Sequence, residues 1–288
     1  MKVLMFGARG RLGTICGAEL ERRAPGSTRF EHQRDGSFLR SVGGRRESLR
    51  LRPAELAALA RSEPLVFVDC SVDHRSTDAL RHHEAEKAEL CEQLDRASLL
   101  ACAIGFGSGI AQLPAQRIRA DHPHMLAYRD VKLRQMELYA RLRCPSFLPS
   151  IFTLVGPLTY ARQAAAWASI LAERARASAD TLVHDPLTRR FWVDESTVAR
   201  NLAAFLAAEH PASVSGPAVD GCFCLDDVAR VPLAAGLPEL RYRSGSSDSW
   251  CIGDYVCDLQ APLAGCLAAS LDAALAAPSP APTHAHHL

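Results

Sequence analysis

Three glycines spaced three residues apart near the start of the chain constrain its fold more than any other feature. The turn Gly7-Ala8-Arg9-Gly10-Arg11-Leu12-Gly13 follows an apolar run of strand length, Lys2 to Phe6. Apolar residues at helical spacing come next, and Pro25-Gly26 predicts the end of that helix. Glycines let a backbone approach a diphosphate closely, and a helix N-terminus offers N–H groups to it. We therefore expect the residues that bind a dinucleotide to include Gly7, Arg9, Gly10, Arg11, Leu12 and Gly13.

Strands and helices alternate over the first half of the chain. The apolar runs at 65–70 and 99–104 predict strands buried on both faces of a sheet, and 147–154 predicts a further strand. A short strand is expected at 28–32, whereas residues 33–50, rich in Gly, Ser and Arg, are expected to be irregular. This alternation is typical of a doubly wound parallel sheet.

The expected fold class is therefore α/β, and we predict three regions. The first is a dinucleotide-binding Rossmann domain over residues 1–157. The second is a smaller mixed α/β substrate-binding region over 158–277, interleaved with the first, with short strands near 188–193 and 221–225. The Pro-rich tail over 278–288 is expected to be disordered.

Composition excludes several classes of partner. The chain has 33 basic and 32 acidic residues, a net charge of +1, which argues against a nucleic acid or an anionic membrane as its partner. No apolar run reaches the roughly 18 residues that span a bilayer, and we find no secretory signal. Ten scattered cysteines in a chain of this size do not suggest a disulfide framework. We expect a cytoplasmic protein that acts on a small molecule.

The choice of dinucleotide depends on the contact to the adenosine ribose. Glu31, near the end of the second predicted strand, suits the free 2′-hydroxyl of NAD. Arg9 inside the turn, with Arg11 and Arg34 expected nearby, suits a 2′-phosphate because the guanidinium matches phosphate geometry. The prediction is NADP(H), with NAD as the alternative.

A second motif places a phenol and an ammonium four residues apart, in Tyr128-Arg129-Asp130-Val131-Lys132. On a helix the two side chains share a face. A phenol is a poor acid or base near neutral pH, and a nearby cation makes it a better one. We expect Tyr128 to be the catalytic acid and Lys132 to assist it and to hold the cofactor's ribose.

Together these motifs resemble the short-chain dehydrogenase/reductase superfamily, in its extended branch of nucleotide-sugar epimerases, dehydratases and reductases similar to dTDP-4-dehydrorhamnose reductase. The resemblance runs from Met1 to about Asp194. It implies that Cys70 and Ser71 lie beside the cofactor. It also implies a substrate contact for Arg189, in a segment similar to the branch's Arg-Asp-Phe-x-x-Val-Asp. Members of the superfamily often form homodimers.

The chain departs from that branch at its third catalytic residue, a Ser or Thr. Counting back from Gly107 leads to Cys102, whose thiol is a weak hydrogen-bond donor. Either Cys102 substitutes, or Ser108 or a substrate-bound water takes its place, or the site is altered. Ala103 and Ile104 stand where dehydratases of the branch have Asp-Glu, which argues against dehydration.

Three functions remain open. The first is an NADP(H)-dependent reductase of a carbonyl on a small or nucleotide-linked substrate. The second is a sugar epimerase that oxidises and re-reduces its substrate, and the third is a dinucleotide-binding regulatory protein with altered catalysis. We expect no metal site, because Cys222, Cys224, Cys251 and Cys257 lack the spacing of zinc ligands.

Overall fold

The computed structural model describes residues 1–33, 35–42, 45–51, 55, 58, 63–112, 123–156, 181–184, 189–224 and 240–243. The chain divides into two compact units. Unit 1 contains residues 1–152 and 196–219, and unit 2 contains 153–195 and 220–288. The tail predicted over 278–288 and Arg34 lie outside the described residues.

The central sheet of unit 1 has the strand order β12-β8-β6-β5-β1-β2-β3-β4, and β7 pairs with β8. Its strands are β1 (Lys2–Phe6), β2 (Thr28–His32), β3 (Phe38–Val42), β4 (Arg45–Leu49), β5 (Leu65–Asp69), β6 (Leu100–Gly105), β7 (Gly107–Ser108), β8 (Ser146–Ile151) and β12 (Val214–Ala218). Strand β1 lies between β2 and β5 and is parallel to both. The direction of winding therefore reverses at β1, the topological switch point where such sheets bind ligands. The predicted doubly wound, Rossmann-like sheet is confirmed.

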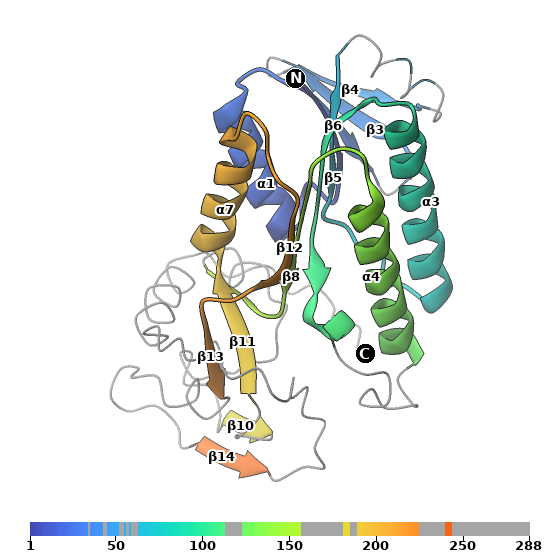
Figure 1. Ribbon diagram of the computed structural model, residues 1–288. Helices are drawn as coiled ribbons and strands as arrows, with labels where there is room; N and C mark the ends of the chain where they lie inside the picture. Colours follow the sequence, from blue (N-terminus) through green and yellow to red (C-terminus); the bar gives the residue numbers. More distant parts are fainter. Residues whose placement is uncertain are drawn as a thin grey trace. The chain divides into compact units, whose positions relative to one another are not determined.

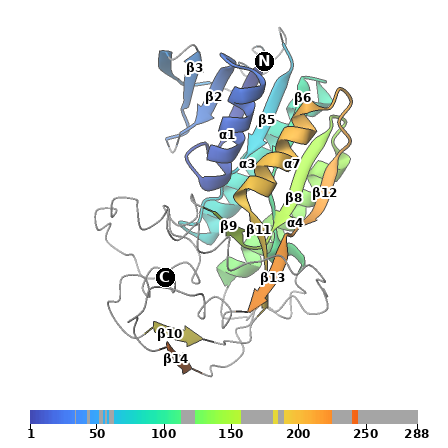
Figure 2. The same ribbon diagram turned by 90° about the vertical axis from the view of Figure 1, so that its left-hand side faces the viewer.

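Among the described residues, helices cover both faces of this sheet (Figures 1 and 2). They are α1 (Arg11–Arg23) and α7 (Glu195–Ala207) on one face, and α3 (Thr77–Arg96) and α4 (Pro123–Arg141) on the other. The core on the α3 and α4 side packs Phe67 and Ala103 against Leu94 and Leu138. A short 3-10 helix, η1 (Gly109–Gln112), follows β7.

Part of the segment 33–50, expected to be irregular, instead forms the antiparallel strands β3 and β4. Phe38 explains why β3 pairs with β2: its ring is buried and packs edge-to-face on Phe6, with ring centroids 6.1 Å apart. Strand β4 lies at the edge of the sheet, and four of its five residues are exposed. An edge strand with charged, exposed side chains lacks the apolar alternation by which strands are found in a sequence.

The described residues of unit 2 form two small sheets. In one, β11 (Arg189–Asp194) pairs with β9 (Leu154–Val155) and β13 (Gly221–Cys224), and in the other β10 (Thr181–His184) pairs with β14 (Leu240–Arg243). Strands β11 and β13 agree with the strands predicted near 188–193 and 221–225. A Cβ on Gly221 would lie 2.6 Å from Nε1 of the buried Trp192, so this pairing requires glycine. Within the described part of the chain, no helix combines the length and hydrophobicity needed to cross a bilayer.

Candidate active site

A cleft of about 1040 Å³ opens at the carboxyl ends of β1, β2 and β5, at the topological switch point. The turn after β1 contributes residues 7–10 to its lining, and the end of β2 contributes residues 31–33. The segment after β5 contributes residues 71–75, and α3 contributes four further residues. The position and size of this cleft suit a dinucleotide.

The glycine turn has the close contacts that a dinucleotide cradle needs. Gly7 has φ +78°, and a Cβ there would lie 2.6 Å from the carbonyl carbon of Cys70. A Cβ on Gly13 would overlap the carbonyl oxygen of Gly7. Gly10 caps α1 without a side-chain hydrogen bond, and its N–H donates to the Gly7 carbonyl at 2.9 Å. Because no side chain caps this helix end, the turn fits a diphosphate at the N-terminus of α1, where Arg11, Leu12 and Gly13 form the first turn.

Arg9 lies at the end of the cleft beside the second strand. Its Nη2 donates to Oε1 of Gln33 at 3.3 Å, and Gln33 Nε2 donates to the Glu31 carbonyl at 2.8 Å. Both Arg9 and Glu31 line the cleft. Arg9, which suits the 2′-phosphate of NADP, and Glu31, which suits the 2′-hydroxyl of NAD, therefore line the same cavity together with the uncharged Gln33.

The side chains of Cys70 and Ser71, at the end of β5, have different surroundings. The thiol of Cys70 contacts that of Cys16 on α1, with 3.7 Å between the sulfurs, and burial raises its pKa well above the usual range. The side chain of Ser71 lines the cleft instead, and its hydroxyl forms a 2.8 Å hydrogen bond with Nε2 of His83. Burial, with the positive charge of Lys87, lowers the pKa of His83 to about 4. Ser71 is therefore the one of the two whose side chain can reach a ligand in the cleft.

Tyr128 and Lys132 come together on α4 as the sequence predicts. The Lys132 ammonium lies 6.0 Å from the centroid of the Tyr128 ring. The ring of His74, which lines the cleft, packs edge-on against Tyr128 with centroids 5.3 Å apart. His74 also forms a 3.0 Å hydrogen bond with His124, one turn before Tyr128. These contacts connect the tyrosine to the wall of the cleft.

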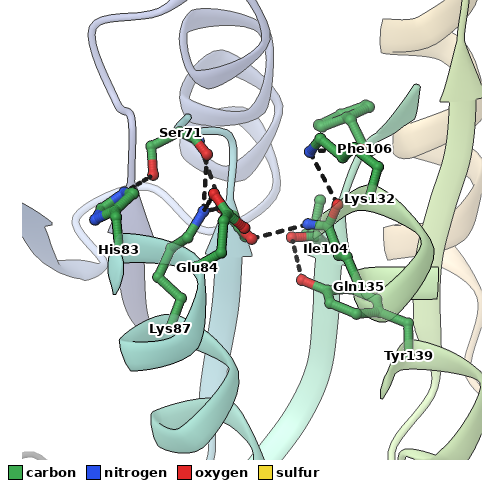
Figure 3. Close-up of polar contacts among 10 residues, drawn as sticks. Ser71, His83, Glu84, Lys87, Ile104, Phe106, Lys132, Gln135 and Tyr139 are labelled. Carbon is green, nitrogen blue, oxygen red and sulfur yellow. Dashed lines mark hydrogen bonds and ion pairs between the residues drawn. The ribbon is translucent and has the colours of Figure 1, made fainter. Parts of the chain in front are cut away.

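Lys132 is only 5% exposed and is held by two hydrogen bonds. It donates to the Phe106 carbonyl and to Oε1 of Gln135, both at 2.9 Å (Figure 3). Gln135 in turn donates to Oδ2 of Asp69 at 2.8 Å. Sequence reasoning missed Asp69 and Gln135. The available signals are an acidic residue that ends a buried apolar strand and an amide three residues after a lysine.

Asp69 also accepts a 2.6 Å hydrogen bond from Lys87, which is only 2% exposed. Lys87 donates further to Oε1 of Glu84 at 2.6 Å and to the Ser71 carbonyl at 2.7 Å. Burial favours neutral Asp69, but Lys87 and Lys132 outweigh it and lower its pKa. Burial, with the charge of Asp69, raises the pKa of Glu84. A single buried polar network thus joins the loop after β5 to α4.

Cys102, predicted to be a catalytic residue, is buried within a strand. It lies inside β6, opposite Val66 of β5, and the strand continues beyond it to Gly105. Ala103 packs in the core beneath α3 and α4, so the alternation of the strand directs Cys102 to the other face. Burial raises the pKa of its thiol to about 12. A count back from Gly107 does not show where β6 ends, and a catalytic role for Cys102 stays a prediction.

Ser108 lies beyond the end of β6, in the short strand β7 that packs against α4. Its hydroxyl accepts a hydrogen bond from the Ile110 N–H at 3.5 Å. Arg189 starts β11 in unit 2, paired with Cys224, and its side chain lies outside the described residues. Across the described ranges, His, Cys, Asp and Glu side chains form no group of three or more that could hold a metal ion.

No family model and no curated protein matches the chain, whereas many solved structures do. MoeE5 in complex with UDP-glucose and NAD has a TM-score of 0.64 and 16% identity, over 95% of this chain and 98% of that one. UDP-glucose 4-epimerase of Thermotoga maritima has a TM-score of 0.61 and 13% identity, over 95% and 98%. UDP-N-acetylglucosamine 4-epimerase of Bacillus cereus has a TM-score of 0.64 and 12% identity, over 98% and 99%.

The chain has the fold of these enzymes. The shared fold extends over nearly the whole length of each compared chain.

Proposed function

We propose that the protein is a nicotinamide-dinucleotide-dependent oxidoreductase that interconverts a carbonyl and an alcohol. One observation carries this proposal: Tyr128 and Lys132 meet on α4, and His74 connects the tyrosine to a cleft whose floor is a glycine turn. One fold can support many activities, so the proposed activity rests on the residues of the site and not on the fold.

Three side chains have separate roles in the proposed reaction. Tyr128 donates its phenolic proton to the carbonyl oxygen during reduction and takes it back during oxidation. Lys132 places a positive charge beside that phenol and offers a donor to the cofactor's ribose. Ser108, beside α4, is better placed than Cys102 to donate a hydrogen bond to the substrate oxygen. A bound nicotinamide supplies the hydride.

For the cofactor we propose NADP(H). Arg9 reaches the end of β2, where its guanidinium contacts Gln33. A 2′-phosphate bound there would pair with this guanidinium, and the neutral side chain of Gln33 would not repel it. Glu31 in the same cleft favours NAD, the cofactor named with MoeE5. The measurement that decides is the dissociation constant of each reduced dinucleotide by calorimetry.

For the reaction, reduction of a carbonyl is the first candidate and sugar epimerisation is the second. The second is favoured by the fold shared with two UDP-sugar 4-epimerases. An epimerase returns its hydride to the same substrate and consumes no net cofactor. Purified protein that contains NAD and converts UDP-glucose or UDP-N-acetylglucosamine without net nicotinamide oxidation would identify it.

The test of the shared chemistry is Tyr128→Phe. We expect the variant to bind NADPH or NADH with unchanged affinity and to lose turnover on a panel of carbonyl compounds and UDP-sugars by roughly 100-fold or more. Wild-type turnover in the variant would refute Tyr128 as the acid. Wild-type protein that binds a dinucleotide but turns over no substrate would favour the regulatory function instead.

A further inference from the structure

We propose that Gln135 is a positioning residue that aims the ammonium of Lys132 at the reacting groups, and that Asp69 sets the orientation of its amide. This inference rests on the proposed function, since Lys132 is the cation placed beside Tyr128. The residues involved come from three elements, β5, α3 and α4 (Figure 3).

The buried cations of this network differ from most basic residues of the chain. Only three of the 33 basic residues in the chain are lysines, and two of them, Lys87 and Lys132, are the buried ones of this network. Arginine presents a planar fork of donors, whereas lysine presents three donors around one compact charge. Both buried cations of this network are therefore lysines in a chain whose basic residues are mostly arginines, and each is a compact charge that can donate in three directions.

Lys87 shows this use of three directions. Its ammonium donates to Asp69, Glu84 and the Ser71 carbonyl at 2.6 to 2.7 Å, so all three N–H groups are used inside the protein. Lys132 donates to the Phe106 carbonyl and to Gln135. Among the described residues these are its two hydrogen-bond acceptors, so its third N–H is left for a ligand and the two acceptors fix its direction.

The charge on Asp69 fixes the orientation of the Gln135 amide. Asp69 forms an ion pair with Lys87, and an ionised carboxylate can only accept hydrogen bonds. The side chain of Gln135 must therefore present its NH2 group to Asp69, which leaves its oxygen facing Lys132. The reverse orientation would place the NH2 group against an ammonium. Lys87 thus orients Lys132 through Asp69 and Gln135.

The test is Gln135→Met, which keeps the length of the side chain and removes both hydrogen bonds. The first measurement is the nitrogen NMR signal of the Lys132 ammonium, resolvable because the chain has three lysines. The signal is assigned by its loss in Lys132→Met. We expect it to be sharp in the wild type and broadened beyond detection in Gln135→Met, because a buried ammonium that loses one of two fixed acceptors reorients and exchanges faster.

The second measurement is the affinity for NADPH and NADH by calorimetry. We expect the dissociation constant to rise about tenfold, the usual effect of one lost hydrogen bond to a charged group. The control is Glu137→Gln, an exposed position on the same helix, which should change neither measurement. Should Gln135→Met fail to fold, Gln135→Asn keeps an amide that is too short for both partners, and the same losses are expected.

An unchanged Lys132 signal in a folded Gln135 variant overturns the proposal. Wild-type protein that binds neither dinucleotide contradicts the proposed function, and the ammonium signal, which needs no ligand, still decides the role of Gln135. Loss of the Lys132 ammonium signal in Gln135→Met but not in Glu137→Gln supports the positioning role of Gln135.

Discussion

Gly13 packs directly on Gly7, so closely that a Cβ on Gly13 would overlap the carbonyl oxygen of Gly7. We expect Gly13→Ala to displace the start of α1 from the turn. The predicted cost is about 1–3 kcal/mol of unfolding free energy, as for other overpacked sites. The weakened cradle should also bind NADPH and NADH less tightly. Urea denaturation and calorimetry measure the two effects.

Gly17, one turn further along α1, provides the matched control. A Cβ there would lie 3.6 Å from Nη1 of Arg29, an ordinary contact. Gly17→Ala should therefore stabilise the protein by about 0.5–1 kcal/mol, the usual gain inside a helix, and leave dinucleotide binding unchanged. Equal effects of the two substitutions would show that the contact with Gly7 is unimportant.

Replacing Lys87 by Met should be the most damaging change in the buried network. It leaves Asp69 and Glu84 without their cation, a situation that typically costs about 3–5 kcal/mol. The loss should be largest at neutral pH and should shrink toward pH values of about 4, because protonation neutralises the two carboxyl groups. Urea denaturation at several pH values measures it. A loss independent of pH would mean that packing, and not charge, is what Lys87 supplies.

His83 should make stability depend on pH in the acid range. Its pKa in the folded protein is about 4, below its ordinary value of 6.5, because burial and Lys87 disfavour the charged ring. A lowered pKa stabilises the fold above pH 6.5, and this contribution is lost as the pH falls toward about 4. His83→Gln, which can still bond to Ser71, should flatten the fall of the urea midpoint over that range. An equally steep fall in the variant would assign it to other groups.

Arg9 should discriminate between the two dinucleotides. Arg9→Gln is expected to weaken NADPH binding about tenfold or more and to leave NADH binding nearly unchanged, because only NADPH carries the 2′-phosphate. Arg22→Gln, at an exposed position near the other end of α1, controls for the lost charge. A parallel loss for both dinucleotides would place Arg9 at the diphosphate instead.

The sequence predicts the local parts of this molecule better than its side-chain geometry. The glycine turn and the apolar strands have signatures within a few residues, and so does the Tyr128–Lys132 pair. The hairpin of β3 and β4 was not predicted because its edge strand is charged. A residue count back to Cys102 could not show where β6 ends. The contacts of Asp69 join residues 18 and 66 positions away in the chain, which no local pattern reveals.

Asp69 uses one carboxylate to hold two helices, accepting from Lys87 of α3 through one oxygen and from Gln135 of α4 through the other. Replacing either Lys87 or Gln135 would therefore change the carboxylate to which the other one donates. When homologous sequences are aligned, these three positions should covary, and a chain that has lost one of the residues should have replaced the remaining two.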